Sequence, residues 1–113
     1  MAFSTDVANR VRHYLDGFPG LHIEEKKMFG GLAFMVNGKM CINVSDDKLM
    51  CRFDPESYEE ISLKPGYEQM IMRGSEYKGY CYVRSEGFES EQDFRFWLEL
   101  CLDYNDRAKS SKK

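Results

Sequence analysis

The dipeptide Asn37-Gly38 constrains this chain more than any other feature of its sequence. Both residues accept a positive φ, which the tightest antiparallel hairpin turn requires, and apolar runs flank them at residues 32–36 and 39–44. The pattern therefore predicts a β-hairpin closed by a two-residue turn. Asp46-Asp47 predicts a second turn, so that a third strand continues the meander toward Phe53.

The two turns fix a register and assign side chains to faces, because opposed residues of an antiparallel pair share a face. The predicted pairs run from Val36 with Lys39 to Leu32 with Asn43, and then place Val44 opposite Leu49, Ile42 opposite Cys51 and Met40 opposite Phe53. One face is then wholly apolar and is the expected core: Ala33, Met35, Met40, Ile42, Val44, Leu49, Cys51 and Phe53.

The opposite face of the meander is mixed in polarity, which is typical of an interface or a partly covered groove. It holds Leu32, Phe34, Val36, Lys39, Cys41, Asn43, Met50 and Arg52. From this face we predict an interaction surface, for a second copy or a protein partner, that contains Leu32, Phe34, Cys41 and Met50.

Elements before and after the meander carry helix and strand signals. Ser4, Thr5 and Asp6 begin an amphipathic helix that ends near Gly17, and residues 22–29 read as a charged edge strand. Asp54-Pro55-Glu56 begins a short helix, and two β-type runs follow at residues 67–73 and 79–84. A final helix begins at Ser90-Glu91-Gln92-Asp93, and its apolar stripe is expected to cover the sheet: Phe94, Trp97, Leu98, Cys101 and Leu102.

Length and composition predict one α+β domain, an antiparallel meander packed by N- and C-terminal helices, over residues 1–106. A hydrophobic content of 42% with 31% charged residues is typical of a globular chain. Residues 107–113 read as a basic tail without apolar periodicity. A net charge of −3 argues mildly against non-specific binding to nucleic acid or membrane.

Cellular location follows from apolar length and cysteine usage. No apolar stretch is long enough for a membrane span, and residues 1–16 lack the apolar centre of a secretory signal. The four cysteines lie far apart in apolar contexts, which favours reduced core residues in a cytoplasmic protein: Cys41, Cys51, Cys81 and Cys101.

No motif predicts catalysis, a cofactor or a metal. Residues 28–31, Met-Phe-Gly-Gly, lack phosphate-loop spacing and precede a strand, so they read as a glycine bend. His13 and His22 have no cysteine or carboxylate at ligand spacing, although a cysteine–histidine pair with Cys41 formed by the fold is a minor alternative. The paired acids read as solvated faces, and we expect a protein that is not an enzyme.

Tyrosines interleaved with cations offer a second candidate function. Tyr67, Tyr77, Tyr80 and Tyr82 alternate with Arg73, Lys78 and Arg84, a pattern that could stack on nucleic acid. Packing of aromatic side chains on the sheet is the commoner explanation.

The chain resembles the N-terminal domain of the TfoX/Sxy family, bacterial proteins whose named members regulate natural competence. The resemblance spans about Val7 to Tyr104 and rests on the order and spacing of four stretches: residues 28–31, 32–40, 47–52 and 78–83.

The resemblance implies an α+β fold similar to type III secretion chaperones, an architecture whose members often form homodimers. It supplies no catalytic residues. Full competence regulators also carry a C-terminal helical domain, and some act with the cyclic-AMP receptor protein at promoters. The chain ends before such a domain, which argues against a competence or transcriptional role. From the mixed face of the meander we expect a dimeric interaction or regulatory module, with a nucleic-acid-linked transcriptional regulator, acting directly or through a partner, as the alternative.

Overall fold

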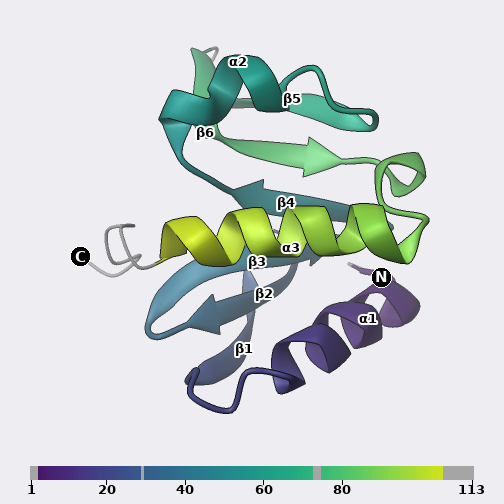
Figure 1. Ribbon diagram of the computed structural model, residues 1–113, viewed down its shortest axis with the longest axis vertical. Coiled ribbons are helices and arrows are strands. Elements are labelled where there is room, and N and C mark those ends of the chain that lie inside the picture. Colours follow the sequence, from purple (N-terminus) through teal and green to yellow (C-terminus); the bar gives the residue numbers. More distant parts are fainter. Residues whose placement is uncertain (1–2, 29, 73–74, 106–113) are drawn as a thin grey trace.

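The computed structural model describes residues 3–28, 30–72 and 75–105, and within them the predicted order of helices and strands is confirmed (Figure 1). Two short 3-10 turns, η1 (Pro55–Ser57) and η2 (Ser85–Gly87), join the longer elements. Those elements are α1 (Thr5–Asp16), β1 (Ile23–Met28), β2 (Gly31–Val36), β3 (Lys39–Ser45), β4 (Lys48–Arg52), α2 (Tyr58–Ile61), β5 (Tyr67–Met72), β6 (Ser75–Val83) and α3 (Glu91–Asn105). The predicted basic tail, residues 107–113, lies outside the described residues.

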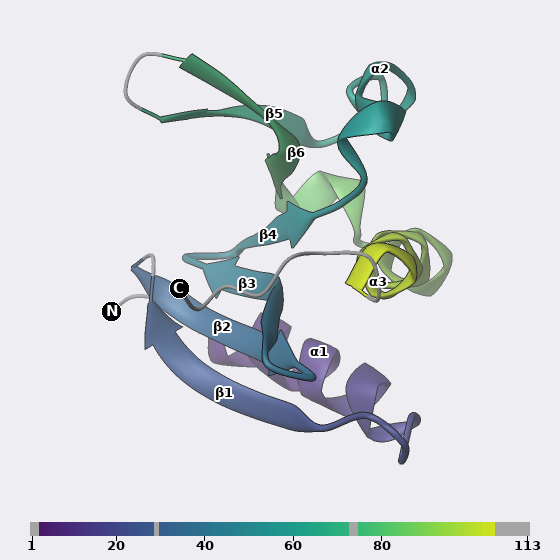
Figure 2. The ribbon, with the colours of Figure 1, turned by 90° about the vertical axis from the view of Figure 1, so that its left-hand side faces the viewer.

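The described strands form one six-stranded antiparallel sheet in the order β1-β2-β3-β4-β6-β5. The charged strand β1 lies at an edge, as its sequence predicts. Helices α1 and α3 lie together on one side of the curved sheet, and Figure 2 shows this arrangement edge-on. The architecture is α+β, with helices near both ends of the chain.

Side-chain caps begin the helices where the sequence places them. Ser4 Oγ accepts a hydrogen bond from the amide of Val7 at 3.3 Å and so begins α1. Asp54 caps η1 by accepting from the amide of Glu56 at 3.0 Å. Ser90 accepts from the amide of Asp93 at 3.0 Å at the start of α3. Each cap satisfies a backbone donor that has no partner inside its own helix.

The first hairpin contains a β-bulge that was not predicted from the sequence. Asn37 and Gly38 have positive φ, and Met35 pairs with Met40 as predicted. Beyond that pair the register shifts by one residue, because Phe34 pairs with Ile42 and leaves Cys41 as the extra residue. The predicted pairs of Phe34 with Cys41, Ala33 with Ile42, and Leu32 with Asn43 are therefore wrong. A bulge of this kind changes which side of the sheet the following residues face.

Because of the shifted register, the side chains of β2 lie on the opposite faces of the sheet from those predicted. Leu32, Phe34 and Val36 join the core beneath the helices, and Cys41 joins it from the bulge. Ala33, Met35 and Met40, which we expected in that core, lie in a cluster on the opposite face. The second hairpin keeps two of its predicted pairs, Val44 with Leu49 and Ile42 with Cys51. Its core assignments are therefore confirmed for Ile42, Val44, Leu49, Cys51 and Phe53. The third predicted pair is wrong, because Met40 and Phe53 belong to clusters on opposite faces.

Candidate protein-interaction surface

The four residues predicted to form an interaction surface are divided between two buried clusters. Leu32, Phe34 and Cys41 belong to the core under the helices, and none is more than 6% exposed. Met50 faces the other side of the sheet and is 1% exposed. The face assignment was wrong for the first three because it assumed a hairpin without the bulge. This set of residues does not form one accessible surface.

The opposite face of the sheet carries a second apolar cluster, made of Ala33, Met35, Met40, Met50 and Met70. Tyr80 and Tyr82 pack against it and are partly buried. The Lys48 ammonium lies 5.7 Å from the ring centre of Tyr82, and the Arg52 guanidinium lies 5.6 Å from that of Tyr80. Both faces of the central strands are thus buried within one chain.

The tyrosines proposed to stack on nucleic acid have packing roles in the sheet. Tyr67 packs against the core under the helices, whereas Tyr80 and Tyr82 pack against the second cluster. The side chains of Arg73, Tyr77 and Lys78 lie outside the described part of the chain. Sheet packing, the commoner explanation, therefore holds for the three tyrosines whose side chains are described.

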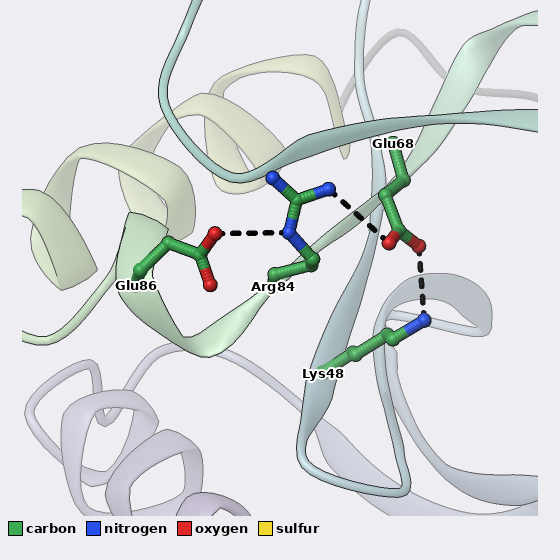
Figure 3. A network of polar contacts seen from close by, with 4 residues as sticks. All are labelled: Lys48, Glu68, Arg84 and Glu86. Atoms are coloured by element: carbon green, nitrogen blue, oxygen red, sulfur yellow. Dashed lines mark hydrogen bonds and ion pairs between the residues drawn. The ribbon is translucent and has the colours of Figure 1, made fainter.

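A chain of ion pairs crosses the sheet near its β5 edge (Figure 3). Lys48 Nζ on β4 lies 2.9 Å from Glu68 Oε1 on β5, and Glu68 Oε2 lies 3.3 Å from Arg84. Arg84 also contacts Glu86 at 3.0 Å. The hydrogen bond from Lys48 lowers the pKa of the Glu68 carboxyl, and that from Arg84 lowers it further. A carboxylate held ionised in this way joins strands and is poorly suited to act as a general acid.

The four cysteines are buried and free of disulfides, as predicted. Cys51 and Cys81 are register partners on β4 and β6, and the Cys101 thiol of α3 interacts with Cys51. Burial raises the pKa of the Cys41 and Cys51 thiols well above the usual range. Reactive cysteines need the thiolate form and some exposure, so these thiols are inert packing groups.

Histidine chemistry with these thiols finds no support in the fold. His22 is exposed and lies 3.4 Å from Glu24, and His13 is exposed on α1. Burial is the main cause of the raised Cys41 pKa, and the charged groups that act on this thiol are Cys101 and Arg52. Among the described side chains, no group of three or more histidines, cysteines or acids is placed to hold a metal ion.

Helix α3 has an accessible apolar surface as well as a buried one. Phe94, Trp97, Leu98 and Cys101 are buried against the sheet. Phe96 and Leu100, one helical turn apart, remain partly exposed. Residues at i and i+4 form a ridge along one side of a helix. The Phe96–Leu100 ridge is bordered by a groove on each side.

The first groove, which we call the α1–α3 groove, has a volume of about 580 Å³. Aromatic side chains form much of its wall, since the Tyr14 and Phe18 rings are 5.3 Å apart and Phe96 lies opposite on α3. Its lining residues are Tyr14, Phe18, Phe96, Glu99, Leu100, Leu102 and Asp103.

Contacts of Arg10 hold the two helices that form this groove. The Arg10 guanidinium lies 4.1 Å from the ring centre of Phe94 on α3 and donates a hydrogen bond of 3.0 Å to the carbonyl of Phe88. It also approaches Glu91 at 3.8 Å. A guanidinium that stacks on an aromatic ring, and that also forms a hydrogen bond and an ion pair, holds α1 against α3. The groove therefore lies between two helices that are linked directly by side-chain contacts.

The second groove, the α2–α3 groove, has a volume of about 550 Å³. The Lys64 ammonium lies 4.2 Å above the ring of Phe96 and covers one side of the ridge. The lining residues are Ser57, Glu60, Ile61, Leu63, Lys64, Pro65, Phe96 and Leu100. We call the two grooves and the ridge between them the α3 surface.

Exposed large apolar side chains gather at the α3 surface. In the described part of the chain, Phe18 at 39% and Leu63 at 85% are the large hydrophobic residues classed as exposed. Phe18 lines the α1–α3 groove and Leu63 lines the α2–α3 groove. Apolar side chains grouped around a groove and rimmed by polar residues mark contact sites for other molecules.

Acidic residues dominate the charge of the α3 surface. Glu60, Glu99 and Asp103 line its grooves, whereas Lys64 is the basic residue among the described lining residues. Burial raises the pKa of the Tyr14 phenol, and the negative charge of Glu99 raises it further, against a lowering by Arg95. The Tyr14 hydroxyl therefore stays protonated at neutral pH and can donate a hydrogen bond at the groove.

Sequence reasoning found the buried stripe of α3 and missed its outer one. The predicted stripe included Leu102 and omitted Phe96 and Leu100. Apolar residues at 96 and 100 widen the stripe beyond the arc that one sheet can cover, because a helix packed on a single sheet needs a limited apolar face. That excess width was the available signal.

Comparison with known proteins gives a family. No helix in the described ranges is long and apolar enough to cross a membrane. A search of curated proteins found no match. The sequence model of the TfoX N-terminal domain matches residues 14–104, which is most of the 113-residue chain. The resemblance noted from the sequence is confirmed, and the chain belongs to the TfoX N-terminal domain family.

Proposed function

We propose that this chain is a non-enzymatic interaction module with a regulatory role and that its contact surface is the α3 surface. The observation that carries the proposal is the position of Phe18 and Leu63, the exposed large apolar residues of the described chain, on either side of the Phe96–Leu100 ridge. Full burial of a leucine or phenylalanine side chain contributes about 1.5–3 kcal/mol. A partner that covers these residues recovers most of that free energy at Leu63, which is 85% exposed, and a smaller part at Phe18, which is 39% exposed.

Two features of the fold support a role without catalysis. Carboxylates such as Glu68 and Glu25 have pKa values lowered by hydrogen bonds from basic side chains, so they serve as ion-pair partners. The four cysteines are buried, and burial raises the pKa of the Cys41 and Cys51 thiols. Neither arrangement offers the matched acid, base or nucleophile that an active site needs.

The regulatory part of the proposal comes from the family, which is associated with competence regulation. The α3 surface is lined by more acids than cations, an arrangement that repels the phosphates of nucleic acid. This charge favours regulation through a protein partner over direct contact with DNA or RNA. The expected homodimer stays a prediction.

A paired comparison of variants tests the proposal. The double variant Phe18→Ser/Leu63→Ser removes the exposed apolar groups, and Asn9→Ser/Gln92→Ser is the control at exposed polar positions. Tagged proteins are used to capture partners from the native host, and light scattering measures the mass of each purified protein, with 13.3 kDa expected per copy. Circular dichroism checks that every variant is folded.

We expect the groove variant to lose a partner, or a self-association, that the wild type and the control both retain. The reason is that apolar contacts at the centre of an interface carry most of its binding free energy. An identical set of captured proteins and an identical mass for all three proteins would remove the α3 surface from consideration.

A further inference from the structure

The α1–α3 groove has the form of a seat for a helix. Its walls are two helices, α1 of 12 residues and α3 of 15 residues, held together by Arg10. Its floor and sides are mainly aromatic and aliphatic, from Tyr14, Phe18, Phe96 and Leu100. An amphipathic helix that enters such a groove places apolar side chains at i, i+3 and i+4 between the walls.

The charge of the groove indicates which kind of helix it would bind. Glu99 and Asp103 are exposed acids at the α1–α3 groove, spaced one helical turn apart, and none of its described lining residues is Lys, Arg or His. The basic residues Arg10 and Arg95 line the adjoining pocket beyond Tyr14 and Phe18, where both pair with Glu91. A partner with basic residues beside its apolar stripe would meet these acids, whereas an acidic partner would be repelled. Resting on the proposed function, we propose that the α1–α3 groove binds a basic amphipathic helix of a protein partner.

A second copy of this chain is a poorer occupant of the groove. Its own α3 surface would bring another Glu99 and Asp103 to the acids already present. Like charges brought together at an interface cost binding free energy. A second copy should therefore bind in the α1–α3 groove more weakly than a basic helix does.

The test uses designed peptides as probes with the full-length protein. A labelled leucine–lysine peptide of about 14 residues forms roughly four turns of amphipathic helix and is comparable in length to the groove walls. A leucine–glutamate peptide with the same spacing reverses the charge. A scrambled leucine–lysine peptide keeps the composition and removes the apolar stripe. Fluorescence anisotropy measures the affinity of each peptide.

Charge reversal on the protein supplies the matched variants. Glu99→Lys/Asp103→Lys changes the acids of the groove, and Glu24→Lys/Glu89→Lys makes the same change of net charge at exposed positions outside it. The Glu99→Lys/Asp103→Lys variant should bind the leucine–lysine peptide at least about tenfold more weakly than the wild type does. The affinity of the Glu24→Lys/Glu89→Lys control should stay within about twofold of the wild type. Phe18→Ser should also weaken binding, since it removes part of the apolar wall.

Several results would overturn the proposal. They are preferential binding of the leucine–glutamate peptide, equal binding of the scrambled peptide, and equal weakening by both charge-reversal variants. A wild type that binds none of the peptides would also overturn it. If partner capture still depends on Phe18 and Leu63 while the basic peptide fails to bind, the interaction surface stands and only the basic helix is wrong.

Discussion

At the scale of single residues, exposure separates the side chains that hold this fold from those free to contact another molecule. Phe34 is 0% exposed, and the guanidinium of Arg12 on α1 lies 6.0 Å from its ring centre. Leu63 is 85% exposed and touches the α2–α3 groove. Both are large apolar residues, yet substitution at the two positions should have opposite kinds of effect.

Phe34→Asp should unfold the protein rather than disrupt a complex. Removal of a buried phenylalanine side chain costs about 3–5 kcal/mol, and an unpaired buried carboxylate adds to that cost. The total approaches the free energy of unfolding of an ordinary domain, about 5–15 kcal/mol. Circular dichroism and urea titration measure the change.

Leu63→Asp is the companion variant, with the same new side chain at an exposed position. Its free energy of unfolding should stay within about 0.5 kcal/mol of the wild type. A folded Phe34→Asp protein of near-normal stability would show that Phe34 is not part of the core.

At the scale of elements, the turn residues predict the pairing of β2 with β3 correctly as far as the bulge at Cys41. Asn37-Gly38 could be recognised from sequence because its positive φ values depend on two neighbouring residues alone. The bulge depends on how β2 and β3 pack beneath the helices, and no residue near Cys41 signals it. One unpaired residue was sufficient to move Phe34 from a predicted interaction surface into the core.

The α3 surface was hidden from sequence reasoning for a related reason. The periodicity of α3 shows that Phe96 and Leu100 are apolar, but not that α1 and the loop after α2 stop short of covering them. Tyr14, Phe18 and Leu63 reach the same surface from distant parts of the chain. The apolar width of α3 signals that some surface there lies outside the core, but the walls of the groove are set by tertiary packing.

Gly31 at the start of β2 tests how closely the paired strands approach. A Cβ at this position would overlap the carbonyl oxygen of Val44 and lie 2.6 Å from Asn43 Oδ1. Gly31→Ala should therefore lower the free energy of unfolding by about 1–3 kcal/mol, the usual cost of overpacking. Urea denaturation measures this difference.

Gly20→Ala is the matched control, because a Cβ there has no atom within 4 Å. It should be neutral or stabilise the protein by up to about 1 kcal/mol, through a less flexible unfolded chain. If Gly31→Ala were as stable as Gly20→Ala, the close approach of β2 to β3 would not exist.

At the scale of the whole molecule, the cysteines connect the parts of the fold that are distant in sequence. Cys41, Cys51, Cys81 and Cys101 come from β3, β4, β6 and α3, and each is at most 1% exposed. Helix α3 and the central strands must separate before these thiols reach water. The rate at which a thiol reagent modifies the native protein should therefore report on opening of the whole core.

Native wild-type protein should react with a thiol reagent only slowly, and all four thiols should react at once in denaturant. Leu63→Cys supplies the control, because a cysteine at this exposed position should add one rapidly modified thiol without changing the slow phase. If the core opens as one unit, the four slow thiols share a single rate, which rises with urea as the free energy of unfolding falls. A rapid phase in the wild type would instead show that one strand or α3 separates by itself, and mass spectrometry of the modified cysteine would identify which element opens.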